Sequence, residues 1–339
     1  MNQKEFIRDF ARLGDLIQSH FSGKKIVPEL DKAIHQSIQV NPWFTSYHIK
    51  KRLTSIACDY LPPQQLETWL SSYPHIEYTY KKEITVVMAG NIPLVGFHDY
   101  LSVLASGKRM AVKLSHKDAH LLPALHHLLC SFAPLWHARL RFVPEVPPDT
   151  DGLIVTGSDA TAAWFTAHYP DLPRIVRGHR ISAAVVPMEI TQEQINDLHS
   201  DMFTFFGLGC RSVVRLFIPQ GFDLFRIANV ESLPEEASHA GFRNAYLRQK
   251  ALLTLQERPF TDGGFFLLQP VDEWNPPVAT VYYTCYSHID EVHRSLATNA
   301  SRLQCVVGTD ADIKNCTTFG FAQNPRLWDY ADGKDTMQL

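Results

Sequence analysis

Cys210 is the residue whose type and surroundings most strongly indicate chemistry. Gly207 and Gly209 precede it, and Arg211 follows it. Glycines allow tight backbone turns and leave room for a substrate, while positive charge and free backbone N–H groups favour the nucleophilic thiolate. The segment therefore predicts a displayed cysteine nucleophile. A buried cysteine in a glycine turn is the alternative, because free cysteine is among the most buried residue types.

Strand-like apolar runs alternate with helix-like segments between residues 84 and 168. This order predicts a parallel sheet with crossover helices, and such sheets bind ligands beyond the carboxyl ends of their strands. The polar residues expected at those ends are Asn91, Lys113 and the pair Gly157 with Ser158. A hydroxyl and a glycine at a helix N-terminus suit a phosphate, with an ordinary helix cap as the alternative. The GxGxxG dinucleotide fingerprint is absent from the sequence.

The order of elements predicts two α/β lobes with a helical N-terminal segment. Residues 1–80 form a helical arm or cap, and 81–187 form a nucleotide-binding α/β domain. Residues 188–310 form a second α/β domain that carries the glycine-flanked cysteine. The polar segment 311–339 is expected to run back across another lobe or subunit.

Composition restricts the classes of function. A chain of 339 residues, 45% hydrophobic and 20% charged, is long enough for two lobes, and its net charge of −3 does not favour nucleic acid or an anionic membrane. No apolar run approaches the roughly 18 residues of a membrane span, and the first residues lack a signal peptide, so a cytoplasmic location is expected. Six scattered cysteines without a CxxC pair are expected to be free thiols. We expect no metal, although His116 and His120 have the spacing of one helix face.

Three motifs in register resemble a known family. They are AGNIPLVGFHD at 89–99, FGLGCRS at 206–212 and DYADG at 329–333. Together they resemble the acyl-CoA reductase family, which includes the fatty-acid reductase subunit of bacterial bioluminescence, within the aldehyde dehydrogenase superfamily. The resemblance covers residues 84–337. It implies a Rossmann-type cofactor lobe and a catalytic lobe that carries the cysteine.

The resemblance also implies an activity, the reduction of an acyl thioester to an aldehyde. Cys210 would attack the thioester, expel CoA or another carrier thiol, and retain the acyl group. The side-chain amide of Asn91 and the backbone N–H of Cys210 would stabilise the oxyanion. A nicotinamide cofactor would then deliver hydride, and the resulting thiohemiacetal would release the aldehyde.

The same resemblance assigns cofactor contacts. Lys113 and Ser115 would hold the adenosine ribose, and Gly157 and Ser158 would lie against the pyrophosphate. Glu273 would contact the nicotinamide ribose, on a likeness of EWNPPV at 273–278 to a Glu-x-Phe-Gly-Pro-Val segment. A solvated loop carboxylate is the alternative for Glu273.

Two departures from the wider superfamily bear on direction and cofactor. Oxidising members carry a glutamate that activates water, whereas no glutamate occurs from 151 to 188. The acyl-enzyme would therefore survive for reduction, although His179 could act as a base. His116 and Lys117 follow Ser115, where NAD-preferring relatives often have an acidic residue, so NADPH is expected, with NADH as the alternative. Arg177, His179 and Arg180 could meet a phosphate or lie in a solvated turn.

Other functions remain open. An NAD(P)-dependent aldehyde dehydrogenase that runs oxidatively is the nearest rival, and an acyl-accepting scaffold with little turnover belongs to a different class. The substrate is expected to be a long-chain acyl-CoA or acyl-carrier thioester, with an acyl-transferring protein as a further partner. A homodimer or higher oligomer follows from the resemblance. Phe203, Phe205 and Phe206 could line an acyl channel, although aromatic residues more often form core.

Overall fold

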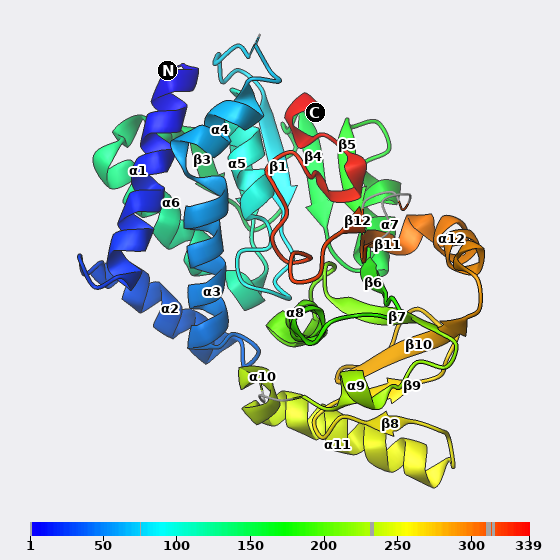
Figure 1. Ribbon diagram of the computed structural model, residues 1–339. Helices are drawn as coiled ribbons and strands as arrows, with labels where there is room; N and C mark the ends of the chain where they lie inside the picture. The colour runs from blue at the N-terminus through cyan, green and yellow to red at the C-terminus, as the bar shows by residue number, and fades with distance from the viewer. Residues whose placement is uncertain (1, 75, 231–233, 310–312, 314–315) are drawn as a thin grey trace. The chain divides into compact units, whose positions relative to one another are not determined.

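The computed structural model describes residues 2–74, 76–230, 234–309, 313 and 316–339 (Figure 1). The chain divides into two compact units. Unit 1 comprises Met1–His179 with Arg326–Leu339, and unit 2 comprises Arg180–Pro325. This boundary lies earlier than the joint placed at 187 from the sequence, because the strand that begins at Ile181 pairs within the sheet of unit 2.

The N-terminal helices form as the spacing of their apolar residues predicts. An Asn2–Glu5 capping box starts the first helix, and a proline stands in the first turn of two others. The third helix is only ten residues long and continues directly as a π-helical turn. Their buried faces share one apolar core with the first sheet, so they belong to unit 1. The elements are α1 (Gln3–Phe21), α2 (Pro28–Val40), α3 (Ser46–Ser55), η1 (Ile56–Tyr60) and α4 (Pro63–Leu70).

The sheet of unit 1 is parallel, as the alternation of strands and helices predicts. Its strand order is β3-β2-β1-β4-β5. Two edge strands were missed because they are short and only partly apolar. The strands are β1 (Glu83–Val87), β2 (Arg109–Lys113), β3 (Leu140–Phe142), β4 (Gly152–Thr156) and β5 (Arg174–Arg177). The connections contain α5 (Phe97–Ala105), η2 (His116–Asp118), α6 (Leu121–Phe132), η3 (Pro134–Arg139) and α7 (Asp159–His168).

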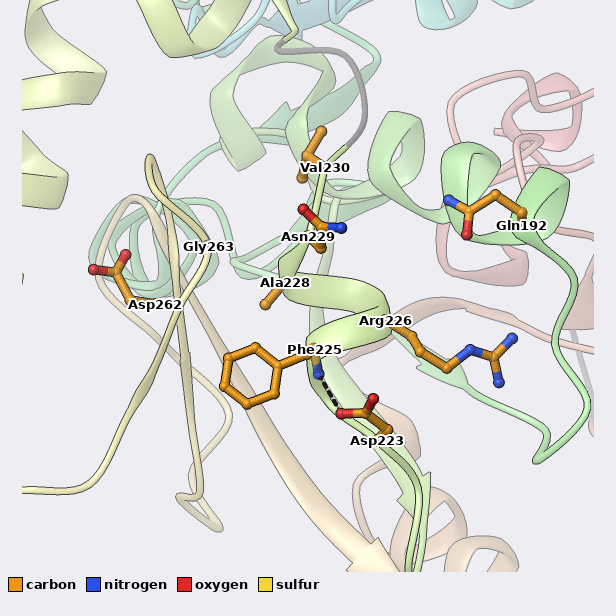
Figure 2. Close-up of a pocket in the computed structure, with 9 residues that line it drawn as sticks. All are labelled: Gln192, Asp223, Phe225, Arg226, Ala228, Asn229, Val230, Asp262 and Gly263. Atoms are coloured by element: carbon orange, nitrogen blue, oxygen red, sulfur yellow. Dashed lines mark hydrogen bonds between the residues drawn. The ribbon is translucent and has the colours of Figure 1, made fainter.

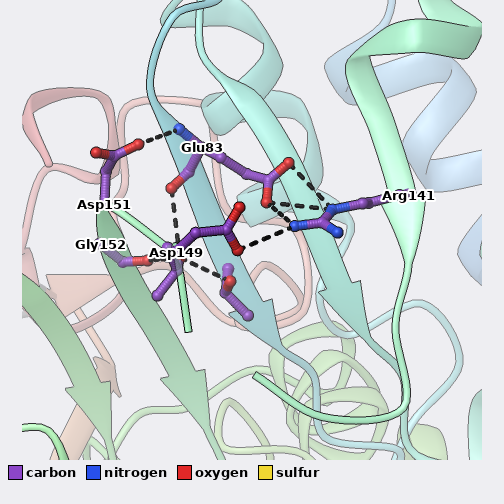
Figure 3. Close-up of polar contacts among 7 residues, drawn as sticks. Glu83, Arg141, Asp149, Asp151 and Gly152 are labelled. Carbon is purple, nitrogen blue, oxygen red and sulfur yellow. Dashed lines mark hydrogen bonds and ion pairs between the residues drawn. The ribbon is translucent and has the colours of Figure 1, made fainter. Parts of the chain in front are cut away.

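Polar contacts anchor the amino end of β1 (Figure 3). The guanidinium of Arg141 lies 2.5 Å from the carboxylate of Glu83 and 3.5 Å from that of Asp149. Asp151 accepts the backbone N–H of Glu83 at 2.8 Å. These contacts tie β1 to β3 and to the segment before β4, at the edge opposite the strand ends that carry the predicted site.

The sheet of unit 2 has strand order β12-β11-β6-β7-β10-β9-β8, with only β8 antiparallel to its neighbour among the described pairs. It confirms the second α/β lobe expected from the sequence. The strands are β6 (Ile181–Val185), β7 (Val213–Pro219), β8 (Thr261–Asp262), β9 (Leu267–Gln269), β10 (Thr280–Tyr286), β11 (Leu303–Val307) and β12 (Cys316–Thr317). The helices are α8 (Gln192–Phe203), η4 (Thr204–Gly207), α9 (Phe225–Ala228), α10 (Glu235–Ser238), α11 (Ala240–Leu255), α12 (Ile289–Thr298) and η5 (Ala300–Arg302).

The C-terminal tail packs on unit 1 from residue 326 onward. It contains η6 (Ala331–Gly333) and η7 (Thr336–Gln338). The hydroxyl of Tyr330 accepts the indole N–H of Trp69 at 2.6 Å and lies 2.8 Å from the hydroxyl of Tyr73. Leu327 and Met337 are also buried in the apolar core of unit 1, so hydrogen bonds and apolar contacts together hold this polar segment.

The described ranges contain no helix with the length and apolar character needed to span a bilayer. They also contain no cluster of three or more His, Cys, Asp or Glu suited to a metal ion. His116 lies in η2 whereas His120 precedes α6, so the two imidazoles do not share one helix face. The cytoplasmic location and the oligomeric state stay predictions.

Candidate active site

The turn that presents Cys210 begins with three consecutive residues in the left-handed region. Phe205, Phe206 and Gly207 have φ values of 57°, 60° and 71°. Glycine adopts this region freely, whereas each phenylalanine pays a conformational penalty of about 1–2 kcal/mol. Both phenylalanine side chains are buried, so packing stabilises the conformation. This local strain, which sequence reasoning missed, lies directly before the cysteine.

Cys210 itself lies between η4 and β7 and is half-buried. The backbone closes around it, because Ser212 donates its N–H to the carbonyl of Gly209 at 3.0 Å. The hydroxyl of Ser182, on β6, donates to the carbonyl of Cys210 at 3.0 Å and lies 3.1 Å from the sulfur of Cys305. The main chain of the turn is therefore anchored to the sheet of unit 2, while Cys210 as a residue is only half-buried.

Cys305 is the thiol behind this turn, and its surroundings differ. It is buried on β11, and this burial raises its pKa above the ordinary value for cysteine. A thiol with a raised pKa stays protonated and is a poor nucleophile. The structure thus separates an accessible cysteine from an inert one in the same part of unit 2.

The aromatic residues before the turn are core, which was the expected alternative to an acyl channel. Phe203 packs against Phe266 with ring centroids 4.7 Å apart, and Phe206 packs against Phe242 at 5.8 Å. Phe205 is also buried. These rings pack in the core next to the left-handed turn and do not line a described cavity.

Glu273 lies in the loop between β9 and β10, and its side chain is exposed. The loop is fixed by Arg215, whose side chain is fully buried on β7. Arg215 donates to the carbonyls of Val271 and of Glu273, the latter at 3.0 Å, and reaches the carboxylate of Asp272 at 2.6 Å. Sequence reasoning missed Arg215, although an arginine inside the apolar strand VVRLFIP was a signal.

In unit 1, Asn91, Lys113 and Gly157 follow or end neighbouring strands, as predicted. Val87 of β1 pairs with Lys113 of β2 on one side and with Val155 of β4 on the other. The three strands therefore finish at one edge, which also carries Ser115 and Ser158. The structure confirms this placement, and the functional roles of these residues stay predictions.

The side chains at this edge suit a phosphate-bearing dinucleotide. Lys113 is half-buried and makes no ion pair or side-chain hydrogen bond within the described ranges. Ser158 caps the ten-residue helix α7 by accepting the N–H of Thr161 at 3.2 Å, so the cap reading holds for its hydroxyl. Asp159 in the first turn accepts the N–H of His179 at 2.7 Å. An ammonium group and a helix N-terminus at the same edge of the sheet, on either side of β1, fit an anionic ligand.

Arg177 corrects an expectation, because it neither lies in a solvated turn nor faces a phosphate. It is buried on β5 and donates twice to Asp99, each time at 2.8 Å. It also donates to the hydroxyl of Thr336 in the tail at 3.1 Å. Arg180 is likewise engaged and donates to the carbonyl of Leu303 at 3.1 Å. His179 is exposed.

Unit 2 also contains an open pocket of about 630 Å³ that none of the predicted site residues lines (Figure 2). The carboxylate of Asp223 accepts the backbone N–H of Phe225 at 3.0 Å, which shapes the start of α9. Asp262 on β8 is paired with Lys250 at 2.5 Å. The lining residues are Gln192, Asp223, Phe225, Arg226, Ala228, Asn229, Val230, Asp262 and Gly263.

Comparison with known proteins finds a likeness in structure only. No family model and no curated protein matches the chain. A putative aldehyde dehydrogenase from Burkholderia cenocepacia aligns with a TM-score of 0.67 at 13% identity, over 92% of this chain and 75% of that one. An acetylating aldehyde dehydrogenase from Geobacillus thermoglucosidasius gives 0.64 at 8% identity, over 98% and 84%. The NAD+ complex of a Bacillus cereus aldehyde dehydrogenase gives 0.60 at 15% identity, over 92% and 73%.

These alignments cover most of the chain and most of each neighbour. Identities of 8–15% are too low to carry more than the fold. The fold class predicted from the sequence is confirmed, and the chain has the α/β fold of the aldehyde dehydrogenases.

Proposed function

We propose that the protein is an acyl-thioester reductase that forms an aldehyde through an acyl group bound to Cys210. The observation that carries the proposal is the half-exposed Cys210 in a strained, glycine-flanked turn, within a chain of aldehyde dehydrogenase fold. The acetylating aldehyde dehydrogenase among the structural neighbours is consistent with thioester chemistry. The absence of glutamate from 151 to 188 favours reduction over hydrolysis of the acyl-enzyme.

In the first step, the thiolate of Cys210 forms a C–S bond to the thioester carbonyl. The tetrahedral adduct collapses, the bond to the carrier sulfur breaks, and the carrier leaves as a thiol after protonation. The family resemblance assigns the oxyanion to the side-chain amide of Asn91 and the backbone N–H of Cys210. Loss of one such donor typically lowers the rate by about 10²–10³.

In the second step, the acyl group leaves as an aldehyde. A reduced nicotinamide, when bound, supplies the hydride that converts the acyl carbonyl carbon to the aldehyde oxidation level. Lys113 and Ser115 would bind the adenosine ribose, Gly157 and Ser158 the pyrophosphate, and Glu273 the nicotinamide ribose. His116 and Lys117 are both exposed and would accept the additional phosphate of NADPH. Breakage of the Cys210–carbon bond frees the thiol for another cycle.

The experiment follows free thiol and NADPH together after mixing the protein with a long-chain acyl-CoA. Cys210→Ala removes the proposed nucleophile, and Cys285→Ala removes an exposed cysteine outside the turn. We expect both signals in the native protein and in Cys285→Ala, and neither in Cys210→Ala. Thiol release limited to one equivalent would instead support an acyl-accepting scaffold. Thiol release that persists in Cys210→Ala would overturn the proposal.

A further inference from the structure

Two turns at the carboxyl edge of the first sheet are packed directly against each other. A side chain at Gly90 would place its Cβ only 2.7 Å from the hydroxyl oxygen of Ser115. Asn41, which ends α2, donates its side-chain N–H groups to the carbonyls of Gly90 and Lys117, at 3.4 and 3.3 Å. The turn after β1, which carries Asn91, thus lies on the turn after β2.

Asp118, in the turn after β2, also bonds to the turn after β1. Its side chain is buried, with 6% of the residue exposed. One carboxyl oxygen accepts the backbone N–H of Leu94 at 2.7 Å, and the other is buried with no hydrogen-bond partner in the described part of the chain. Burial of a carboxyl oxygen without a hydrogen-bond partner is costly. The bond to the Leu94 N–H is the contact by which Asp118 contributes to the structure of this turn.

Leu94 is the residue that needs this bond. Its φ is 52°, in the left-handed region, which costs a non-glycine residue about 1–2 kcal/mol. Asp118 holds its N–H, and Arg52 on α3 donates to its carbonyl at 3.5 Å. The N–H and the carbonyl of Leu94, three residues after Asn91, are therefore both held by side chains from other segments.

We propose that Asp118 is a positioning residue for Asn91, because it holds Leu94 in the left-handed conformation that shapes the Asn91–Leu94 turn. The functional consequence rests on the proposed function, in which Asn91 stabilises the oxyanion. The structural part stands on the contacts of unit 1 alone. Asp118 touches neither substrate nor cofactor in this scheme and acts only through the backbone of the turn.

The test compares Asp118→Ala, which lacks an acceptor, with Asp118→Asn, whose amide oxygen still accepts the Leu94 N–H. Asp151→Ala is the matched control, because Asp151 also accepts a backbone N–H, from Glu83 at 2.8 Å, at the opposite edge of the sheet. Rates of thiol release at varied acyl-CoA concentration separate kcat from KM. Amide hydrogen exchange over residues 89–97 reports on the turn without any activity.

For Asp118→Ala we expect kcat for thiol release to fall by about 10- to 100-fold, less than loss of an oxyanion donor itself, with KM little changed. Exchange over 89–97 should accelerate. Asp118→Asn and Asp151→Ala should resemble the native protein in both measurements. Unchanged exchange over 89–97 in Asp118→Ala, or an unchanged kcat despite faster exchange, would overturn the inference. Absence of thiol release from the native protein would instead sink the proposed function, and exchange would still decide whether Asp118 holds the turn.

Discussion

The hydroxyl of Ser182 donates to the carbonyl oxygen of Cys210 at 3.0 Å, and this bond ties the nucleophile turn to β6. Ser182 is fully buried, so its hydroxyl has no water to replace this partner. The contact fixes the main chain of Cys210 through its carbonyl oxygen. Positioning of the cysteine is thus built into the sheet.

Replacement of Ser182 by Ala tests this bond. Loss of a buried hydrogen bond costs about 1 kcal/mol in stability, and misplacement of the cysteine should slow thiol release several-fold. Urea unfolding and thiol release from acyl-CoA measure the two effects. Ser212→Ala is the control, because Ser212 is equally buried and its hydroxyl accepts from Gln323 at 3.2 Å instead. Equal rates in the two variants would contradict the role of Ser182.

Arg215 should support both stability and cofactor binding. Arg215→Met leaves the carbonyls of Val271 and Glu273 without this donor, and we expect a loss of about 2–4 kcal/mol in the free energy of unfolding. Arg215→Lys keeps the positive charge but lacks the forked set of donors that holds the loop. We expect it to raise KM for NADPH and to lower the free energy of unfolding by less than Arg215→Met does. Urea unfolding and steady-state kinetics measure these effects, with the exposed Arg302→Met as control. A native KM in Arg215→Lys would argue against Glu273 as a cofactor contact.

The buried pair of Asp99 and Arg177 should be among the costliest to break. Both side chains are 7% exposed, and Asp99→Asn leaves a buried guanidinium without its counter-charge. Removal of one partner of a buried pair costs about 3–5 kcal/mol, whereas an exposed pair contributes less than about 1 kcal/mol. Asp329→Asn, which weakens the partly exposed pair with Arg326, is the comparison. Similar urea midpoints for the two variants would show that the Arg177 contact is not formed as described.

Asp118 should make stability depend on pH. Burial raises its pKa to about 7, from an unfolded value of about 3.9. Between these values the folded state binds the proton and the unfolded state does not, so the free energy of unfolding falls as pH rises through this window. Asp118→Asn lacks this titration, and its stability relative to the native protein should improve from about pH 4 to about pH 7. Urea unfolding across this range measures the difference, and parallel curves would contradict a raised pKa.

The sequence was sufficient to predict the alternation of strands and helices along the chain, a parallel sheet, and the placement of Asn91 and Lys113 at the ends of its strands. Apolar runs that end in polar residues signal the carboxyl ends of buried strands, and parallel strands bring those ends together. The glycines beside Cys210 likewise signalled a turn. These features are local, which is why single segments contain the information.

The missed features depend on partners far along the chain. Nothing near Arg177 in the sequence indicates Asp99, and nothing near Asp118 indicates Leu94, because burial and pairing arise only when distant segments pack. The left-handed conformations of Phe205 and Phe206 could not be predicted from the local sequence, because phenylalanine, unlike glycine, rarely adopts that region. The supporting residues of the site therefore needed the structure.

The central claim is that Cys210 carries the acyl group between the two steps. Intact-mass and peptide mass spectrometry of the protein after incubation with a long-chain acyl-CoA, before and after addition of NADPH, tests it directly. We predict one acyl adduct on the peptide that contains Cys210, and its discharge as free aldehyde when NADPH is added. An adduct on another residue would contradict the claim. Aldehyde formation by the Cys210→Ala variant would contradict it as well.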